Sequence, residues 1–131
     1  MKTAYLLLAA AALTVSADVF AQAGGRRISG QIPAEQAQDF IGSNGTVCGK
    51  VESANYAQNA AGEPTFLHLG AAFPRQPFQV RINGADRANF GFAPEVELKD
   101  KVICATGRIA RSSNRAEIVI RGPSELALAA N

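Results

Sequence analysis

Hydrophobic and polar residues alternate with a period of two in several short segments of this chain. Such alternation is typical of β-strands that pack one face on a core and turn the other to water. Between the segments lie turns rich in glycine, proline, asparagine and serine, which end strands. The pattern therefore predicts five strands, at residues 46–54, 64–69, 78–82, 102–111 and 116–121.

Three other segments have the features of helices. A short helix is expected at residues 32–41, where Pro33 suits the first helical position and Gly42 suits the C-terminal cap. Residues 85–92, between the third and fourth strands, are either a short helix or an irregular crossover. Residues 124–130 are expected to be a weak helix or coil.

The spacing of these elements indicates one fold. Five short strands with a long connection between the third and the fourth, at residues 83–101, suggest an OB-fold, a five-stranded Greek-key barrel. We expect an all-β domain, a barrel with a short N-terminal helix and a short helix between strands 3 and 4. Gly49 would permit the bend that the first strand of such a barrel needs.

The first residues differ in character from the rest. Lys2 precedes an uncharged apolar run at residues 4–15, and small residues allow cleavage after Ala21 or Ala23. This is the pattern of a secretory signal peptide, and the run is shorter than the ~20 residues of a spanning helix. We expect a periplasmic or secreted protein without stable membrane insertion after cleavage. The expected segments are a signal peptide (1–21), a disordered lead (22–30), an OB-fold domain (31–126) and a tail (127–131).

The net charge of the chain excludes few classes of function. The 131 residues suit a single domain and carry a net charge of +2. Cleavage after Ala21 would remove one basic residue, Lys2, and one acidic residue, Asp18, so the net charge would not change. This mild excess is unlike the strongly basic balance of nonspecific nucleic-acid binders, so any binding depends on where the charges lie.

Both cysteines lie in predicted strands. An even number of cysteines in an exported chain indicates a disulfide. In an OB barrel the first and fourth strands pair antiparallel, and Cys48 and Cys104 each lie on the more polar face of their strand. We therefore expect a Cys48–Cys104 bond. The alternative is two small buried thiols that pack as hydrophobic groups.

Four blocks of the sequence resemble a known group of proteins. They are residues 46–51, 64–70, 78–82 and 102–109. In order and spacing they resemble small exported bacterial OB-fold domains, which are described as nucleic-acid-binding-like and some of which occur beside nuclease domains. The resemblance spans residues 41–126 and implies the same fold. Family members often have Asn in place of His68 and a Gly or Tyr near the turn that here reads Ser112-Ser113-Asn114.

The fold suggests where a ligand would bind. OB barrels bind single-stranded nucleic acid on the face of strands 2 and 3, using aromatic platforms beside positive charges. The candidate binding residues are Lys50, Tyr56, Phe66, His68, Arg81, Arg108, Arg111 and Arg115. We therefore predict an exported, non-catalytic OB-fold module that binds single-stranded nucleic acid on this face.

Each of these residues also has a simpler interpretation. Phe66 could cover a second small core under the N-terminal helix, and His68 could be a surface or hydrogen-bonded side chain. The arginines could be solvated edge charges. The alternative function is a periplasmic structural or interaction module for an envelope protein or a small ligand. A continuous positive groove across Lys50, Arg81 and Arg115 would favour nucleic acid, and scattered charge would favour the alternative.

Catalytic patterns do not emerge from the sequence. Glu95, Glu97 and Asp100 are close together, but they alternate with lysines in a way typical of a solvated edge. The chain has no glycine-rich phosphate loop, zinc-ligand spacing or nucleophile elbow. We expect no enzyme activity, no catalytic residues, no metal site and no cofactor.

Overall fold

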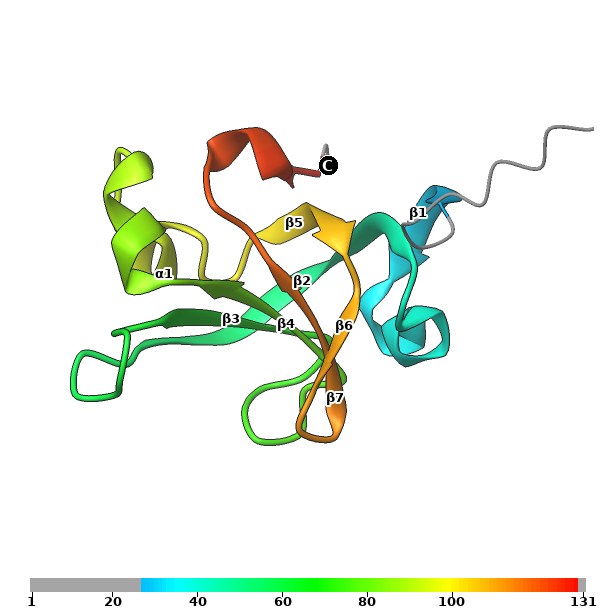
Figure 1. Cartoon of the computed structure of the whole chain (residues 1–131), viewed down its shortest axis with the longest axis horizontal. Helices are drawn as coiled ribbons and strands as arrows, with labels where there is room; N and C mark the ends of the chain where they lie inside the picture. The colour runs from blue at the N-terminus through cyan, green and yellow to red at the C-terminus, as the bar shows by residue number, and fades with distance from the viewer. Residues whose placement is uncertain (1–26, 130–131) are drawn as a thin grey trace, which may run out of the picture.

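A computed structural model describes residues 27–129 of the chain. The expected signal peptide, the first part of the expected lead and the last two residues lie outside the described residues. The described chain is mostly β-structure, with eight strands, three short 3-10 helices and one short α-helix (Figure 1).

The strands are β1 (Arg27–Pro33), β2 (Asn44–Tyr56), β3 (Thr65–Leu69), β4 (Phe78–Ile82), β5 (Val102–Arg108), β6 (Ala110–Ser112), β7 (Arg115–Val119) and β8 (Leu126–Leu128). The helices are η1 (Ala34–Phe40), η2 (Gly84–Asn89), α1 (Pro94–Glu97) and η3 (Pro123–Glu125). Each of the five predicted strands is present, with shifted bounds.

The strands form one mixed sheet in the order β6-β7-β4-β3-β2-β5-β8, and β1 pairs with β2 at its side. The β1–β2 and β4–β7 pairs are parallel and the others are antiparallel. The sheet has eight strands and its hydrogen bonds do not close it into a barrel. The prediction of a closed five-stranded barrel is therefore wrong in strand number and closure.

The predicted fourth strand divides at Ile109, and this division leaves the sheet open. The Ile109 amide donates to the Ser43 carbonyl at 2.8 Å, and its carbonyl accepts the Gly42 amide at 2.7 Å. These bonds join Ile109 to the turn after η1, so a strand partner cannot use them. The residues before it form β5, paired with β2, and those after it form β6, paired with β7.

Both ends of the described chain contain strands that the sequence did not predict. β1 begins at Arg27, inside the predicted disordered lead, because Ile32 is buried and pairs with Val47 of β2. The predicted N-terminal helix is the 3-10 helix η1. β8 replaces the expected C-terminal helix or coil and pairs with β5, so it includes part of the expected tail.

The predicted helical connection between the third and fourth strands consists of η2 and α1. Pro94 begins α1, which suits a residue without a backbone N–H.

The core lies on the inward face of the sheet, as the alternation predicts. Its fully buried members from the strands include Val47, Val51, Leu67, Leu69, Phe78, Val80, Ile82, Ile103 and Ile118. A Cβ added at Gly49 would lie 2.9 Å from the Ala34 Cβ, so glycine allows η1 to approach β2.

The predicted Cys48–Cys104 disulfide is confirmed. The two residues lie directly opposite each other in the antiparallel β2–β5 pair, with their Cα atoms 4.0 Å apart. Beside them on the same face, the hydroxyls of Thr46 and Thr106 share a hydrogen bond of 2.8 Å. A disulfide is typical of an oxidising compartment outside the cytoplasm. Within residues 27–129, no helix has the length and apolar character needed to cross a membrane.

β2 changes partner along its length and so places the site. Its first half pairs with β5, and its second half pairs with β3 from Val51 to Tyr56. β3 then pairs with β4, and β4 with β7. The outward face of this part of the sheet is available for a ligand.

Candidate functional site

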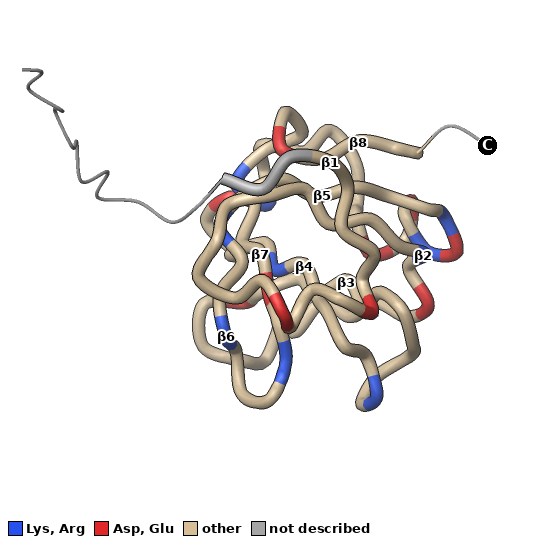
Figure 2. Tube along the Cα trace, turned by 90° about the vertical axis from the view of Figure 1, so that its right-hand side faces the viewer, with Lys and Arg blue, Asp and Glu red and all other residues tan. Residues whose placement is uncertain are grey.

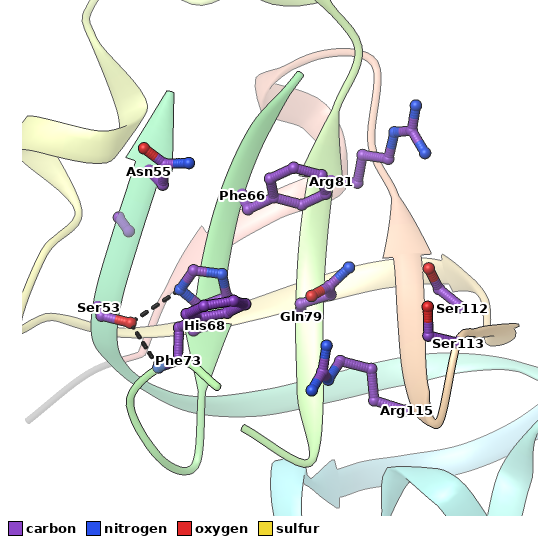
Figure 3. A pocket seen from close by; sticks show the side chains of 11 residues that line it. Ser53, Asn55, Phe66, His68, Phe73, Gln79, Arg81, Ser112, Ser113 and Arg115 are labelled. Atoms are coloured by element: carbon purple, nitrogen blue, oxygen red, sulfur yellow. Dashed lines mark hydrogen bonds between the residues drawn. The ribbon is translucent and has the colours of Figure 1, made fainter. Parts of the chain in front are cut away.

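A groove lies on the outward face of β2, β3 and β4. Its volume is about 550 Å³. The loop of residues 70–77 and the β6–β7 turn rise on its sides (Figure 3). We call it the β3–β4 groove. It is lined by Ser53, Ala54, Asn55, Phe66, His68, Phe73, Gln79, Arg81, Ser112, Ser113 and Arg115.

The strand register sets these side chains in two rows across the sheet. One row runs from Asn55 through Phe66 to Arg81, which are direct neighbours in the register. The second row runs from Ser53 through His68 and Gln79 to Glu117. Side chains opposite each other on one face of a sheet are close enough to interact.

Three aromatic rings lie together on one side of the groove. The rings of Phe66 and His68 are nearly parallel, at 12°, with centroids 6.4 Å apart. The Phe73 ring lies 5.3 Å from that of His68 and is 63% exposed. The Arg81 guanidinium carbon lies 5.9 Å from the Phe66 ring centroid, a cation–π contact. The groove therefore offers aromatic rings beside a positive charge.

His68 is held in place by Ser53. The His68 Nδ1 and the Ser53 Oγ are 2.8 Å apart, and the Phe73 amide donates to the same Oγ at 2.9 Å (Figure 3). Burial lowers the pKa of His68, the positive charge of Arg115 lowers it further, and a hydrogen bond with the Ser53 backbone raises it. The imidazole is therefore neutral near pH 7. The alternative interpretation of His68, a hydrogen-bonded side chain, agrees with its contact to Ser53.

A chain of polar side chains continues the second row. Gln79 donates from its Nε2 to the Glu117 carboxylate at 2.6 Å and accepts a bond from the Gln76 Nε2 at 3.1 Å. All three side chains are buried. The Gln76 Oε1 is buried and has no hydrogen-bond partner among the described residues. Both ends of the Gln79 amide are engaged, so its orientation in the groove is fixed.

Arg115 joins the two sides of the groove. Its Nη2 donates to the Pro74 carbonyl at 2.9 Å and its Nε to the Gln76 carbonyl at 3.3 Å. These bonds connect the start of β7 with the 70–77 loop. Arg115 is thus a positive charge with a fixed guanidinium at one end of the groove.

The structure brings four of the eight candidate residues into the groove: Phe66, His68, Arg81 and Arg115. Lys50 and Arg108 lie on exposed positions of β2 and β5, in the half of β2 that pairs with β5. Arg111 lies on β6 opposite Ala116, whose side chain points into the core, so Arg111 is on the other face from the groove.

Tyr56 has a structural partner. It ends β2 instead of lying in a loop, and the Arg87 guanidinium carbon lies 3.7 Å from its ring centroid. Arg87 also makes two bonds with Glu95, at 2.7 and 2.8 Å, and one with the Thr65 hydroxyl at 2.8 Å. Bonding to Arg87 lowers the pKa of the Glu95 carboxyl. The pair fastens the helical connection to the sheet.

Six groove residues that are polar or aromatic were absent from the sequence-based candidates. They are Ser53, Asn55, Phe73, Gln79, Ser112 and Ser113. The alternation along β4 places Gln79 on the outward face, so that signal was present. In β2 a register shift between Val51 and Ser53 turns Ser53 and Asn55 outward, although alternation from the buried Val47 and Val51 would place them inward. Phe73 lies in a proline-containing loop, where periodicity gives no information on direction.

Charge is scattered over the molecule. Lys and Arg lie among Asp and Glu around the whole trace in Figure 2. Arg81 and Arg115 line the groove and Lys50 does not, so these three residues do not form one continuous positive groove. Among residues 27–129 no group of three or more His, Cys, Asp or Glu side chains could hold a metal ion.

Comparison of the chain with models of protein families and with curated protein sequences found no match. The resemblance to exported OB-fold domains therefore stays a prediction.

Proposed function

We propose that this protein is an exported OB-fold module that binds single-stranded nucleic acid in the β3–β4 groove. The observation that supports this most strongly is the pair of accessible aromatic rings, Phe66 and Phe73, that lies against the buried His68 and beside Arg81 and Arg115. Rings of this kind stack with bases, and arginines pair with phosphates. The module has no catalytic role in this proposal.

The order of strand pairing supports the OB-fold part of the proposal. A five-stranded OB barrel pairs strand 1 with strands 2 and 4, and strand 3 with strands 2 and 5. β2, β3, β4 and β7 take the places of strands 1, 2, 3 and 5, and β5 with β6 takes that of strand 4. In this interpretation Ile109 is a bend in a single strand, whose first part, β5, pairs with β2 and whose second part, β6, pairs with β7.

The proposed binding combines stacking with charge. Each base that stacks on an aromatic ring contributes about 1–3 kcal/mol, and this contribution depends little on which base it is. With two arginines in the groove, we expect few phosphate contacts and a modest affinity. The dependence on salt would be correspondingly shallow, with a slope near −0.7 for each phosphate that is neutralised.

Two features support export to the periplasm or the exterior. The disulfide suits an oxidising compartment. The first 21 residues have the composition of a signal peptide, although they lie outside the described residues.

A second candidate function is the binding of a small molecule or an envelope protein. Two observations favour it: the charges are scattered, and a groove of about 550 Å³ lies in the usual range for small-molecule sites. Capture from an envelope extract, with and without excess single-stranded DNA, would separate the two functions. A partner that remains bound in the presence of DNA would favour this second candidate.

Fluorescence anisotropy tests the leading proposal. The exported form would be titrated into a labelled single-stranded oligonucleotide at low and at moderate salt. Binding at low salt that weakens as salt is added is expected, because counterion release then favours the complex less. Failure to bind at ~10 μM protein in low salt, where this contribution is largest, would contradict the proposal.

A further inference from the structure

The β3–β4 groove is closed at one end. The 70–77 loop and the start of β7 meet there through the bonds of Arg115 with Pro74 and Gln76. The Ala116 amide adds a bond to the Pro77 carbonyl at 3.3 Å. Figure 3 shows Phe73 and Arg115 at this end, below His68 and Gln79.

The opposite end is bounded differently. Asn55, Phe66 and Arg81 form the last row of the lining, and no lining residue in the described chain lies beyond them. Figure 3 shows Asn55 and Arg81 on either side of Phe66 at this end. The groove therefore has an open entrance between Asn55 and Arg81 and a closed end at Arg115.

Arg115 retains hydrogen-bonding capacity at the closed end. A guanidinium has five N–H donors. Two of them bond to the carbonyls of Pro74 and Gln76, so three remain. Because the carbonyl bonds fix the plane of the guanidinium, little conformational entropy is lost when the remaining donors bind an anion.

From this geometry we infer that the groove holds the end of a single strand, with a terminal phosphate at Arg115. The first bases then stack on Phe73 and Phe66, whose rings are accessible and lie beside the buried His68, and the rest of the strand leaves past Arg81. A strand without ends cannot place a terminal phosphate at the closed end. This inference rests on the proposed function and adds that the site selects strand termini.

A competition experiment with linear and circular DNA tests the inference. An internally labelled oligonucleotide is displaced by unlabelled single strands of roughly 30 nucleotides, well above the site size of an OB-fold. One competitor is linear and the other is the same sequence closed covalently into a circle. We expect the linear strand to compete at least tenfold better. A ratio below threefold would overturn the inference, and any larger ratio supports it.

The two proposals fail in different ways. If the labelled probe does not bind the protein at all, the proposed function fails. If the circle binds as well as the linear strand, nucleic-acid binding stands and the selection of ends fails. Linear strands with a phosphate at the 5′ end, at the 3′ end or at neither test Arg115. Equal affinity of all three would contradict the placement of a phosphate there.

A pair of variants tests the role of Arg115 directly. Arg115→Gln removes the guanidinium at the closed end, and we expect the linear-to-circular ratio to fall to about one. Arg111→Gln is the matched control, because Arg111 is exposed and does not line the groove. Its ratio should equal that of the unmodified protein. If Arg115→Gln does not fold, the ratio measured on the unmodified protein decides alone.

Discussion

The side chains of the groove act through neighbours that fix their positions. Ser53 holds the His68 ring, and Gln76 and Glu117 hold the Gln79 amide. Phe66 has the Arg81 guanidinium over its ring. A groove with side chains fixed in this way loses little entropy when a ligand binds, which favours recognition of a planar group.

Replacing Phe66 tests the stacking. In Phe66→Leu the hydrophobic volume is largely kept and the aromatic face is lost. We expect single-stranded DNA to bind about 5- to 150-fold more weakly, which corresponds to the ~1–3 kcal/mol of one stacked base. Anisotropy titration measures the change. Phe92→Leu is the matched control, since Phe92 is also partly exposed but lies outside the groove. Equal losses in both variants would contradict a specific role for Phe66.

His68 gives the folded protein a pH dependence. Its pKa is lowered in the fold, so below its ordinary value of about 6.5 the unfolded chain binds more protons than the native protein. The free energy of unfolding should therefore fall as pH decreases through 6.5. Urea unfolding at pH 7.5 and 5.5 measures this fall. In His68→Gln the fall should be smaller, and an equal fall in both proteins would contradict this role.

For single residues, the sequence predicted the face of the sheet correctly where a side chain follows the alternation along its strand. The period of two placed Phe66, His68 and Arg81 on the outward face, where the structure has them. The alternation could not predict the cation–π contact between Arg87 and Tyr56, because that contact depends on how residues 84–97 fold back over β2 and β3. Charge alone did not distinguish the arginines of the groove from those outside it.

Among the secondary-structure elements, the short helices that connect β4 and β5 are held to the sheet by specific side-chain contacts. η2 and α1 have six and four residues, too few to be stable as isolated helices. Arg87 joins them to the sheet through Glu95, Thr65 and Tyr56. We expect these contacts to hold the connection against the sheet.

Glu95→Gln tests the contribution of the ion pair. The substitution removes the charge of the bidentate partner, and we expect a loss of about 1 kcal/mol of unfolding free energy. Chemical denaturation at pH 7 measures the loss. Glu97→Gln, on an exposed position of the same helix, is the control and should have little effect. Similar losses in both variants would show that the pair contributes no specific stabilisation.

The disulfide joins β2 to β5, the strand that pairs with the first half of β2. The bond joins residues separated by 56 positions, and chain-entropy models give about 4 kcal/mol for a loop of this length. The double variant Cys48→Ala/Cys104→Ala should lose a comparable free energy in urea unfolding. Reduction of the unmodified protein is the parallel test. A loss below ~1 kcal/mol in both would contradict this contribution.

For the molecule as a whole, the sequence indicated the class of fold better than its closure. Five strands could be predicted because each carries its own alternation. β8 has only three residues, and the pairing of β1 with β2 and of β8 with β5 depends on contacts that no local pattern reveals, so neither strand could be predicted. The division at Ile109 follows from hydrogen bonds with Gly42 and Ser43, which no local pattern reveals.

The distribution of charge over the whole molecule limits the binding we propose. A net charge of +2 with scattered lysines and arginines offers little long-range attraction to a polyanion. Affinity must therefore come from the groove itself, through its rings and its two arginines. The same distribution explains why the alternative of a small ligand or protein partner is retained.

Chemical-shift mapping by NMR tests the central claim most directly. A labelled sample of the exported form is titrated at low salt with a single-stranded oligonucleotide. We predict that the amide shifts change around Ser53, Phe66, His68, Arg81 and Arg115 and stay unchanged around Lys50 and Val102. No change anywhere, or changes confined to the face around Lys50, would contradict binding in the β3–β4 groove.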